Sequence, residues 1–446
     1  MRHRDIAANE VHDTLRRHML ADGYPIVIDL SHSRDSWVRD QISGRDYLDF
    51  FSFFASNPLG FNHPAMLDDE TQRRLARVAT TKVSNSDYYT QYMAEFVDTL
   101  SRTAAPPELS HYFFVDGGAL AVENAMKVAF DWKVRKNVAA GRGERGSAIL
   151  HLEDAFHGRS GYTLSVTNTD PVKTLHFPKF EWPRISSPAI HFPLEGENLA
   201  RVIEAETVAL AEAERAFDQR PDEIAAILVE PIQGEGGDNH FRPEFFRELR
   251  RLADEREALL IYDEVQTGVG LTGKWWAYQH HGISPDVLCF AKKMQVGGLF
   301  ASSRVDEVTH NVFVVPSRIS STWGASLVDM VRCTRILEII VAEGLIDKAA
   351  ARGSDLLGGL RRIQERFSDT VSNARGAGLM CALDLPSSEL RNRIVRRCFD
   401  DGMIVLPSGR RSIRFRPTLT VTESAISEGV GRLESAIAAV LAFGAG

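Results

Sequence analysis

Cysteine is scarce in this sequence. Its 446 residues include four cysteines, Cys289, Cys333, Cys381 and Cys398. They lie in apolar or helical contexts, and their spacing matches no metal-binding motif. This pattern excludes a disulfide-stabilised scaffold and a cysteine-bound metal centre. We therefore expect four reduced thiols in the core of a cytoplasmic protein.

Long apolar runs and an excess of positive charge are also absent. No stretch of roughly 18 consecutive apolar residues occurs, so the sequence predicts no membrane-spanning helix. The first residues, Met1–Asp5, are charged and lack the apolar core of a secretion signal. The formal net charge is −8, which gives no reason to expect nucleic acid or an anionic membrane as a partner. The hydrophobic content of 44% is ordinary for a globular protein.

Hydrophobic patterning predicts an α/β protein with a mostly parallel central sheet and helices on both faces. The expected strands of this sheet span residues 111–115, 147–152, 225–232, 259–263 and 287–290. The expected helices that follow them span residues 119–136, 197–217, 242–256 and 325–343. Near the N-terminus we expect a helix at 5–21 and strands at 25–30 and 47–54.

The same pass along the chain predicts two domains. A large domain spans residues 58–325, and a smaller α+β domain combines residues 1–57 with 326–446. Residues 166–196 contain several prolines and form a long irregular loop. A loop of this length inside a compact domain is usually functional or lies at an interface.

Two apolar runs end on side chains that suit one kind of chemistry. Leu259–Tyr262 is followed by Asp263, and Val287–Phe290 is followed by Ala291 and Lys292. Ligands bind at the carboxyl ends of parallel strands, so we expect an acid and an amine to meet there. Pyridoxal phosphate (PLP) requires this pair, because a lysine forms its Schiff base and an acid keeps its ring nitrogen protonated. A structural salt bridge uses the same residue types, so the spacing alone does not decide.

A nucleotide site is a second interpretation of this region. Asp263 and Glu264 end an apolar strand as the magnesium-binding acids of ATPases do, and Gly268–Lys274 nearly completes a phosphate loop. However, Trp275 stands where such a loop needs Ser or Thr, and no strand precedes the loop. We therefore reject the ATPase interpretation.

Other residues suited to binding follow the remaining predicted strands. Gly118 and Ala119 begin a helix where backbone N–H groups can bind a phosphate. Phe156 can stack on an aromatic cofactor, and Arg159 can bind a carboxylate through two hydrogen bonds. Glu235 lies in a glycine-flanked loop, free to pair with a cation. Taken separately, each residue also fits an ordinary core, turn or surface position.

Together, these motifs resemble one family. The segments Phe156–Arg159, Glu230–Glu235, Asp263–Gln266 and Ala291–Lys292 are similar to those of class III (omega) aminotransferases. The resemblance runs from about residue 47 to residue 420. It implies the PLP-dependent transferase fold of type I, PLP as the cofactor, no metal, and a homodimer.

The resemblance assigns roles at the cofactor. It implies that Lys292 forms the Schiff base; Lys293 is excluded because the family's lysine follows a small residue, here Ala291. It further implies that Asp263 binds the ring nitrogen and that Phe156 stacks on the ring. The remaining cofactor-binding residues that it implies are His157, Gln266 (to the ring oxygen), and Gly118, Ala119 and Thr322 (to the phosphate), with Thr322 reaching the cofactor of the partner subunit.

It also assigns roles at the substrate. Arg159 and Arg414 would bind carboxylates, and Glu235 would cover Arg414 while the amino donor reacts and leave it when the keto acid reacts. Whether Arg416 shares the role of Arg414 stays open. A silent PLP-binding protein is disfavoured because the lysine, the acid and both arginines are present. Racemisation and decarboxylation are disfavoured by the pairing of Glu235 with Arg414.

Longer blocks indicate the substrate. Gly117–Trp132, Asp263–Tyr278 and similar segments resemble family members that transfer the ε-amino group of L-lysine to 2-oxoglutarate. That reaction would give 2-aminoadipate 6-semialdehyde and glutamate. Three residues depart from this pattern, namely Gly297, Ser302 and Ser320. Ornithine, 4-aminobutyrate or a diamine therefore remains an alternative donor.

Overall fold

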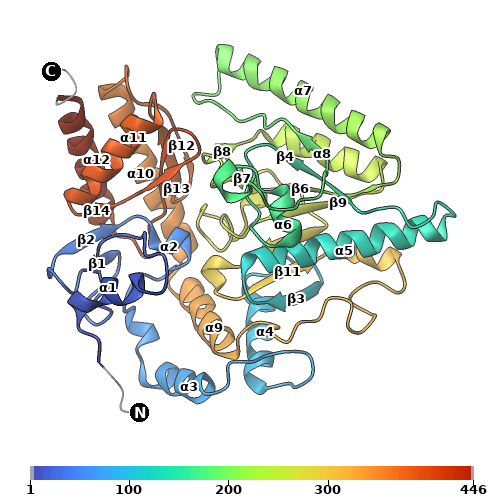
Figure 1. The fold of residues 1–446 in the computed structure, drawn as a ribbon, viewed down its shortest axis with the longest axis horizontal. Helices are drawn as coiled ribbons and strands as arrows, with labels where there is room; N and C mark the ends of the chain where they lie inside the picture. Colours follow the sequence, from blue (N-terminus) through green and yellow to red (C-terminus); the bar gives the residue numbers. More distant parts are fainter. Residues whose placement is uncertain (1–4, 443–446) are drawn as a thin grey trace.

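The computed structural model describes residues 5–442; residues 1–4 and 443–446, at the two ends of the predicted small domain, lie outside the described part. A seven-stranded sheet forms the centre of the fold (Figure 1). In spatial order its strands are β3 (His111–Val115), β11 (Gly297–Ala301), β10 (Val287–Phe290), β9 (Leu259–Asp263), β6 (Ile224–Val229), β4 (Ala148–Leu152) and β5 (Arg184–Ile185). Strand β11 is antiparallel to both neighbours, and the other pairs are parallel. The predicted mostly parallel sheet is confirmed.

All five predicted strands of this sheet form, but the structure adds β11 and the short edge strand β5, and it shortens one prediction. Strand β5 lies inside the segment 166–196, which was expected to be irregular. The expected strand 225–232 ends at Val229, and the short strands β7 (Ile232–Gln233) and β8 (Asn239–His240) pair with each other instead. Strand β11 was not predicted, because Gly297 and Gly298 resemble a turn. Both glycines are needed for close packing: a Cβ on Gly298 would lie 2.4 Å from the Phe113 carbonyl oxygen.

Helices cover both faces of the sheet, which explains why its strands are continuous apolar runs. In β9, Leu259 and Ile261 pack with α5 on one face, whereas Leu260 and Tyr262 belong to the main core on the other. Alternation along the strand then directs Asp263 to the α5 face. The helices of this part are α4 (Gln91–Thr103), α5 (Gly118–Ala139), α6 (Gly161–Val166), α7 (Gly196–Gln219) and α8 (Pro243–Glu255). Figure 1 shows α7 and α8 on the opposite side of the sheet from α5.

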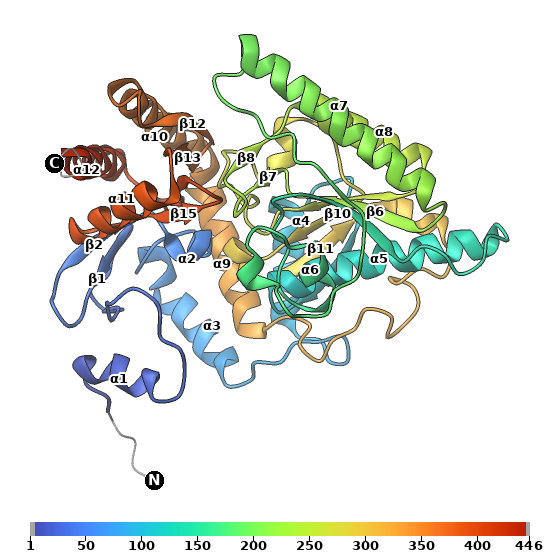
Figure 2. The same ribbon diagram turned by 45° about the horizontal axis from the view of Figure 1, so that its top comes forward.

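The C-terminal third packs with the N-terminal segment, as Figure 2 shows. Strand β14 pairs in parallel with β2, so segments from the two ends of the chain share one small sheet. The strands here are β1 (Trp37–Arg39), β2 (Asp46–Asp49), β12 (Ser372–Ala377), β13 (Met380–Asp384), β14 (Met403–Ile404), β15 (Leu406–Ser408) and β16 (Ser412–Phe415). The helices are α9 (Leu327–Ala342), α10 (Leu345–Arg366), α11 (Ser388–Asp400) and α12 (Glu423–Ala442). The boundaries at residues 58 and 325 stay a prediction.

The N-terminal predictions were partly wrong. The helix expected at 5–21 is limited to a short turn and α1 (Val11–Arg16). Further along the chain, α3 spans Asp69–Ala79. The strand at 25–30 reduces to one isolated bridge. The strand at 47–54 ends at Asp49, whose carboxylate accepts hydrogen bonds from the N–H groups of Phe51 and Ser52 at 2.8 and 2.9 Å. The chain then enters α2 (Ser52–Ala55), a single turn whose residues all have positive φ angles.

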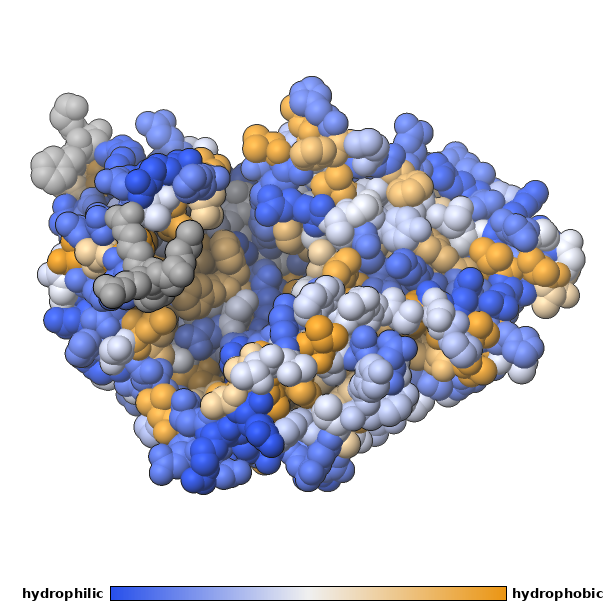
Figure 3. All heavy atoms as spheres, turned by 60° about the horizontal axis from the view of Figure 1, so that its bottom comes forward, coloured by the Kyte–Doolittle hydropathy of each residue, from blue (hydrophilic) through white to orange (hydrophobic). Residues whose placement is uncertain are grey.

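Three further observations concern the whole described chain. All four cysteines are buried and unpaired, as predicted. None of the helices formed by residues 5–442 combines the length and apolar character needed to cross a bilayer. The face of the molecule in Figure 3 is hollowed, with hydrophobic and hydrophilic side chains together at the walls.

We expect Gly298→Ala to lower the free energy of unfolding by about 1–3 kcal/mol, because the added methyl group overpacks the space between β11, β3 and the Phe290 ring. Chemical denaturation measures this change. Gly431→Ala is the matched control: nothing lies within 4 Å of its added Cβ in α12, so it should stabilise the protein by about 0.5–1 kcal/mol. Equal effects of the two substitutions would contradict this account of β11.

Candidate active site

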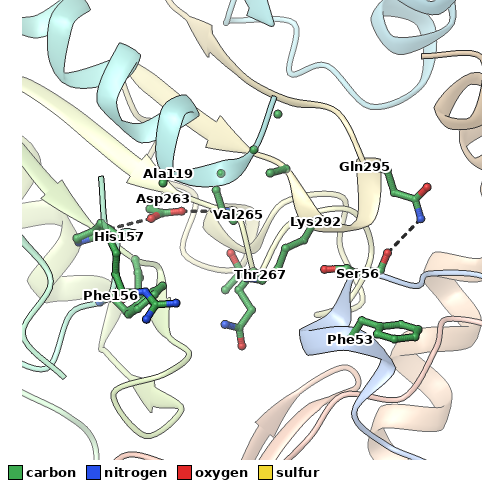
Figure 4. Close-up of a pocket in the computed structure, with 18 of the residues that line it drawn as sticks. Phe53, Ser56, Ala119, Phe156, His157, Asp263, Val265, Thr267, Lys292 and Gln295 are labelled. Atoms are coloured by element: carbon green, nitrogen blue, oxygen red, sulfur yellow. Dashed lines mark hydrogen bonds and ion pairs between the residues drawn. The ribbon is translucent and has the colours of Figure 1, made fainter. Parts of the chain in front are cut away.

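A cavity of about 880 Å³ lies beside the ends of β9 and β10 (Figure 4). Its walls come from the loops that follow these strands, from the start of α5, and from α2. Of the residues predicted from sequence, it brings together Gly118, Ala119, Phe156, His157, Arg159, Asp263, Gln266 and Lys292. Phe53 lies across the cavity from Asp263 in Figure 4. It was expected in a strand, but it belongs to α2, and its exposed fraction is 42%.

Asp263 is the last residue of β9 and is only 5% exposed. Its Oδ2 lies 2.8 Å from Nδ1 of His157, and its Oδ1 accepts the N–H of Val265 at 3.0 Å. Because a carboxylate only accepts hydrogen bonds, the His157 Nδ1–H is the donor. The acid therefore pairs with a histidine, and the salt bridge considered from the sequence, between Asp263 and Lys292, does not form.

Lys292 follows β10 and lies on the cavity wall (Figure 4). Burial lowers the pKa of its amine, and the negative charge of Asp263 partly opposes that change. A lysine with a lowered pKa loses its proton more readily and is a better nucleophile. The neighbouring Lys293 is 2% exposed and donates from Nζ to the Gln266 carbonyl oxygen at 2.7 Å. Lys292, and not Lys293, is therefore the amine available in the cavity.

Glu230 is a site residue to which the sequence reasoning gave no role. It is buried at the end of β6, and its carboxylate accepts the N–H groups of Phe156 and Gly234, each at 2.9 Å. Burial raises its pKa to about 7, with a smaller lowering from His157. One carboxyl group thus holds both the loop of Phe156 and the loop of Glu235. Its position at the end of a predicted strand, in the segment Glu230–Glu235, is the sequence feature that could have identified it.

The beginning of α5 is suited to a phosphate. Gly117, in the capping position, makes no side-chain cap, so the first N–H groups of the helix remain available to an anion. A Cβ on Gly118 would lie 2.8 Å from the Val265 side chain, so the close approach of the helix to this loop depends on glycine. Thr322, the other predicted phosphate ligand, is exposed in its own chain and is not among the residues of this cavity.

Two arginines near Gln266 have different surroundings. Arg416 is fully buried and forms an ion pair with Asp238, with Nη1 donating to Oδ2 at 2.8 Å. It also donates from Nε to Gln266 Oε1 at 3.0 Å. Arg414 donates weakly to the same oxygen, at 3.4 Å, and its buried Nε has no partner among the described residues. Burial lowers the pKa of Arg414 to about 10.

A second cavity, of about 900 Å³, adjoins the first and shares Phe156, Arg159, Gln266 and Lys292 with it. Arg414 and Glu235 also line it, so the structure brings both predicted carboxylate-binding arginines to one space. Glu235 forms its ion pair with Lys173 rather than with Arg414. Lys173 was not predicted; the long loop 166–196 that carries it was the available signal.

Comparisons with known proteins agree with this arrangement. The family model described as "Aminotransferase class-III" matches residues 19–437. An L-lysine-epsilon aminotransferase from Mycobacterium tuberculosis is 52% identical over 439 residues, covering 98% of this chain and 97% of that protein. One from Streptomyces clavuligerus is 49% identical over 438 residues, covering 98% and 96%. The solved structure of a lysine aminotransferase from M. tuberculosis gives a TM-score of 0.96 at 50% identity, covering 98% of this chain and 100% of that one.

These findings confirm the predicted fold and the predicted family. Aminotransferases of this class use PLP, and the residues around the cavity fit it: a buried acid, an available lysine, an aromatic ring and an uncapped helix start. The family match covers most of the chain, and the similarity to the relatives extends over nearly all of it. The chain belongs to the class-III aminotransferases.

Proposed function

We propose that this protein transfers the ε-amino group of L-lysine to 2-oxoglutarate, giving 2-aminoadipate 6-semialdehyde and glutamate. The observation that carries the proposal is the joining of two cavities: Asp263 lines the first, Arg414 lines the second, and Lys292 and Arg159 line both. The similarity to L-lysine-epsilon aminotransferases over nearly the whole chain supports the donor. The four unpaired cysteines suit the cytoplasm.

Bound PLP supplies an aldehyde that takes up the amino group and a ring that accepts electrons. Asp263, oriented by His157, holds a proton at the ring nitrogen, because a nearby anion favours the charged form of that nitrogen. The Nζ of Lys292, with its lowered pKa, accepts and returns the proton of the substrate carbon that carries the amine. Phe156 would cover the ring, and the first N–H groups of α5, at Gly118 and Ala119, would hold the phosphate.

The two substrates place carboxylates differently. L-Lysine presents its ε-amino group on a neutral chain, with its carboxylate far away, and we assign that carboxylate to Arg159. 2-Oxoglutarate brings a second carboxylate close to the reacting carbon, and we assign it to Arg414, whose buried Nε has no partner in the described chain. Glu235 covers Arg414 in the first half-reaction only. The proposal includes a homodimer in which the partner subunit's Thr322 binds the phosphate, since Thr322 is exposed in its own chain.

A donor screen tests the proposed substrate. With 2-oxoglutarate as acceptor, we expect kcat/KM for L-lysine to exceed that for ornithine, 4-aminobutyrate and diamines by roughly tenfold or more, since one methylene in a fitted site is worth about 10–200-fold. Glutamate formation is the measurement, and mass spectrometry identifies the aldehyde product. Lys292→Ala is the control without the amine and should form no glutamate. A higher kcat/KM for ornithine would assign the protein to a different donor.

The gate is tested by regioselectivity. Without the carboxylate of Glu235, Arg414 can accept the carboxylate of L-lysine and so bring the α-amino group to the cofactor. We therefore expect Glu235→Ala to raise the fraction of α-transamination product, measured by mass spectrometry of the products. Glu235→Gln keeps the size but not the charge and should behave like Glu235→Ala. Unchanged regioselectivity in both variants would refute the gate.

The roles of Arg414 and Arg416 are distinguished by measuring, for a variant of each, the free energy of unfolding and the KM for 2-oxoglutarate. Arg416→Met leaves Asp238 as a buried, unpaired charge and should lower the free energy of unfolding by about 3–5 kcal/mol. Arg414→Met removes a cation without an ion-pair partner and should raise KM for 2-oxoglutarate roughly 30-fold or more, with little loss of stability. Denaturation and acceptor titrations measure the two effects. The reverse pattern would give Arg416 the carboxylate-binding role.

A further inference from the structure

Lys173 forms an ion pair with the proposed gate residue. The two side chains, Lys173 and Glu235, are 26% and 24% exposed and stand together on the wall of the second cavity. Lys173 ends a short helical turn that Asp170 caps through the N–H of Val172 at 3.0 Å. The lysine is therefore placed by an ordered turn of the long loop. Its Nζ also lies 5.6 Å from the centre of the Phe156 ring.

The second cavity, on whose wall the gate residue lies, is rich in positive charge. Its charged residues are Arg159, Lys173, Lys292, Arg391, Arg410 and Arg414, with the acids Asp154, Asp170 and Glu235. Burial lowers the pKa of Lys173, Asp170 raises it, and the charges of Arg159 and Arg414 lower it further. The positive charges therefore repel one another across this space. One carboxylate cannot neutralise Lys173 and Arg414 at once, so its position decides which of them is left for a substrate.

The backbone at the proposed gate is held by several contacts, so the side chain of Glu235 is the part that is free to change position. The Glu235 carbonyl oxygen accepts the N–H of Gly409 at 2.9 Å and the hydroxyl of Ser408 at 3.3 Å. On its other side, a Cβ on Gly236 would lie 2.0 Å from the Asp154 carbonyl oxygen, so the loop is packed tightly against its neighbour. A displacement of the whole loop would break these contacts, whereas rotation of the Glu235 side chain breaks none of them.

We propose that Lys173 is a positioning residue that holds Glu235 away from Arg414, so that Arg414 is open to the carboxylate of the keto acid. The structure shows this open arrangement, with Glu235 on Lys173 and the Nε of Arg414 without a partner. The inference rests on the proposed function, because it requires Arg414 to bind a carboxylate. Lys173 itself does not touch the substrate in this arrangement, since its amine is paired with Glu235.

Binding of glutarate to the PLP-loaded enzyme tests the proposal without turnover, because glutarate has two carboxylates and no reactive carbonyl. Lys173→Met leaves Arg414 as the cation for Glu235, and we expect it to raise the calorimetric Kd of glutarate roughly tenfold. Lys173→Arg keeps the charge and should restore binding to within about threefold. Lys179→Met is the matched control, an exposed lysine of the same loop, and should bind glutarate like the wild type. Wild-type affinity in Lys173→Met would overturn the proposal.

A double-mutant cycle separates positioning from direct contact. Without Glu235 there is nothing to hold away from Arg414, so Lys173→Met should not weaken glutarate binding further in a Glu235→Ala background. An equal loss in both backgrounds would mean that Lys173 binds the dicarboxylate itself, and the positioning role would be wrong.

Arg414→Met distinguishes this inference from the function on which it rests. If Arg414→Met binds glutarate like the wild type, the carboxylate role of Arg414 is wrong, and the inference fails with it. If Arg414→Met loses glutarate while Lys173→Met keeps it, the inference alone is wrong.

As a second readout, the first half-reaction with L-lysine, followed by cofactor absorbance, should keep its KM in Lys173→Met, because only the acceptor step needs Arg414 open. A parallel rise in both KM values would indicate a general structural defect and contradict positioning.

Discussion

The hydrogen bond between His157 and Asp263 is the contact on which the chemistry of the cavity depends. A buried carboxylate without a partner would be protonated or would destabilise the fold by several kcal/mol. His157, in the loop after β4, meets Asp263 at the end of β9 because β6 holds these two strands in parallel register. That register is fixed by apolar side chains buried on both faces of each strand. The core thus keeps the acid in place and leaves the amine of Lys292 unpaired with it.

Two adjacent lysines show how the backbone separates a reactive side chain from a structural one. The chain leaves β10 through Ala291 and turns at Lys292, whose φ of 21° lies at the edge of the left-handed region. Lys293 is buried and donates to the carbonyl oxygen of Gln266, and burial holds its pKa well below the usual range. A neutral buried amine costs less than a charged one. Lys293 therefore anchors the turn that presents Lys292 to the cavity.

The sequence was most informative for strands that are buried on both faces of the sheet, because such strands require a continuous apolar run. The runs at 259–263 and 287–290 formed strands with the expected bounds, and the polar residues at their ends met in one cavity. Strand β11 was missed because its glycines are needed for close packing against Phe113 and Phe290 of the neighbouring strands. No local sequence pattern reveals that contact. Glu230 and Lys173 were missed for a related reason: their roles depend on partners far away in the chain, at Phe156 and Glu235.

Two arginines at the end of β16, Arg414 and Arg416, give the site a positive charge that needs an anion as partner. Arg414 and Arg416 are two residues apart, so an extended backbone directs them to the same side. Asp238 forms a buried ion pair with Arg416, whereas no acid among residues 5–442 forms an ion pair with Arg414. With a pKa of about 10, Arg414 stays protonated at neutral pH and, being buried, favours any carboxylate that can reach it. Glu235 is one of the acids of the second cavity, and its carboxylate is paired with Lys173. In the proposed mechanism, a keto acid brings its own carboxylate to Arg414 and leaves Glu235 to Lys173. A neutral alkyl amine chain offers Arg414 no carboxylate. This difference would let one cavity accept both substrates in turn.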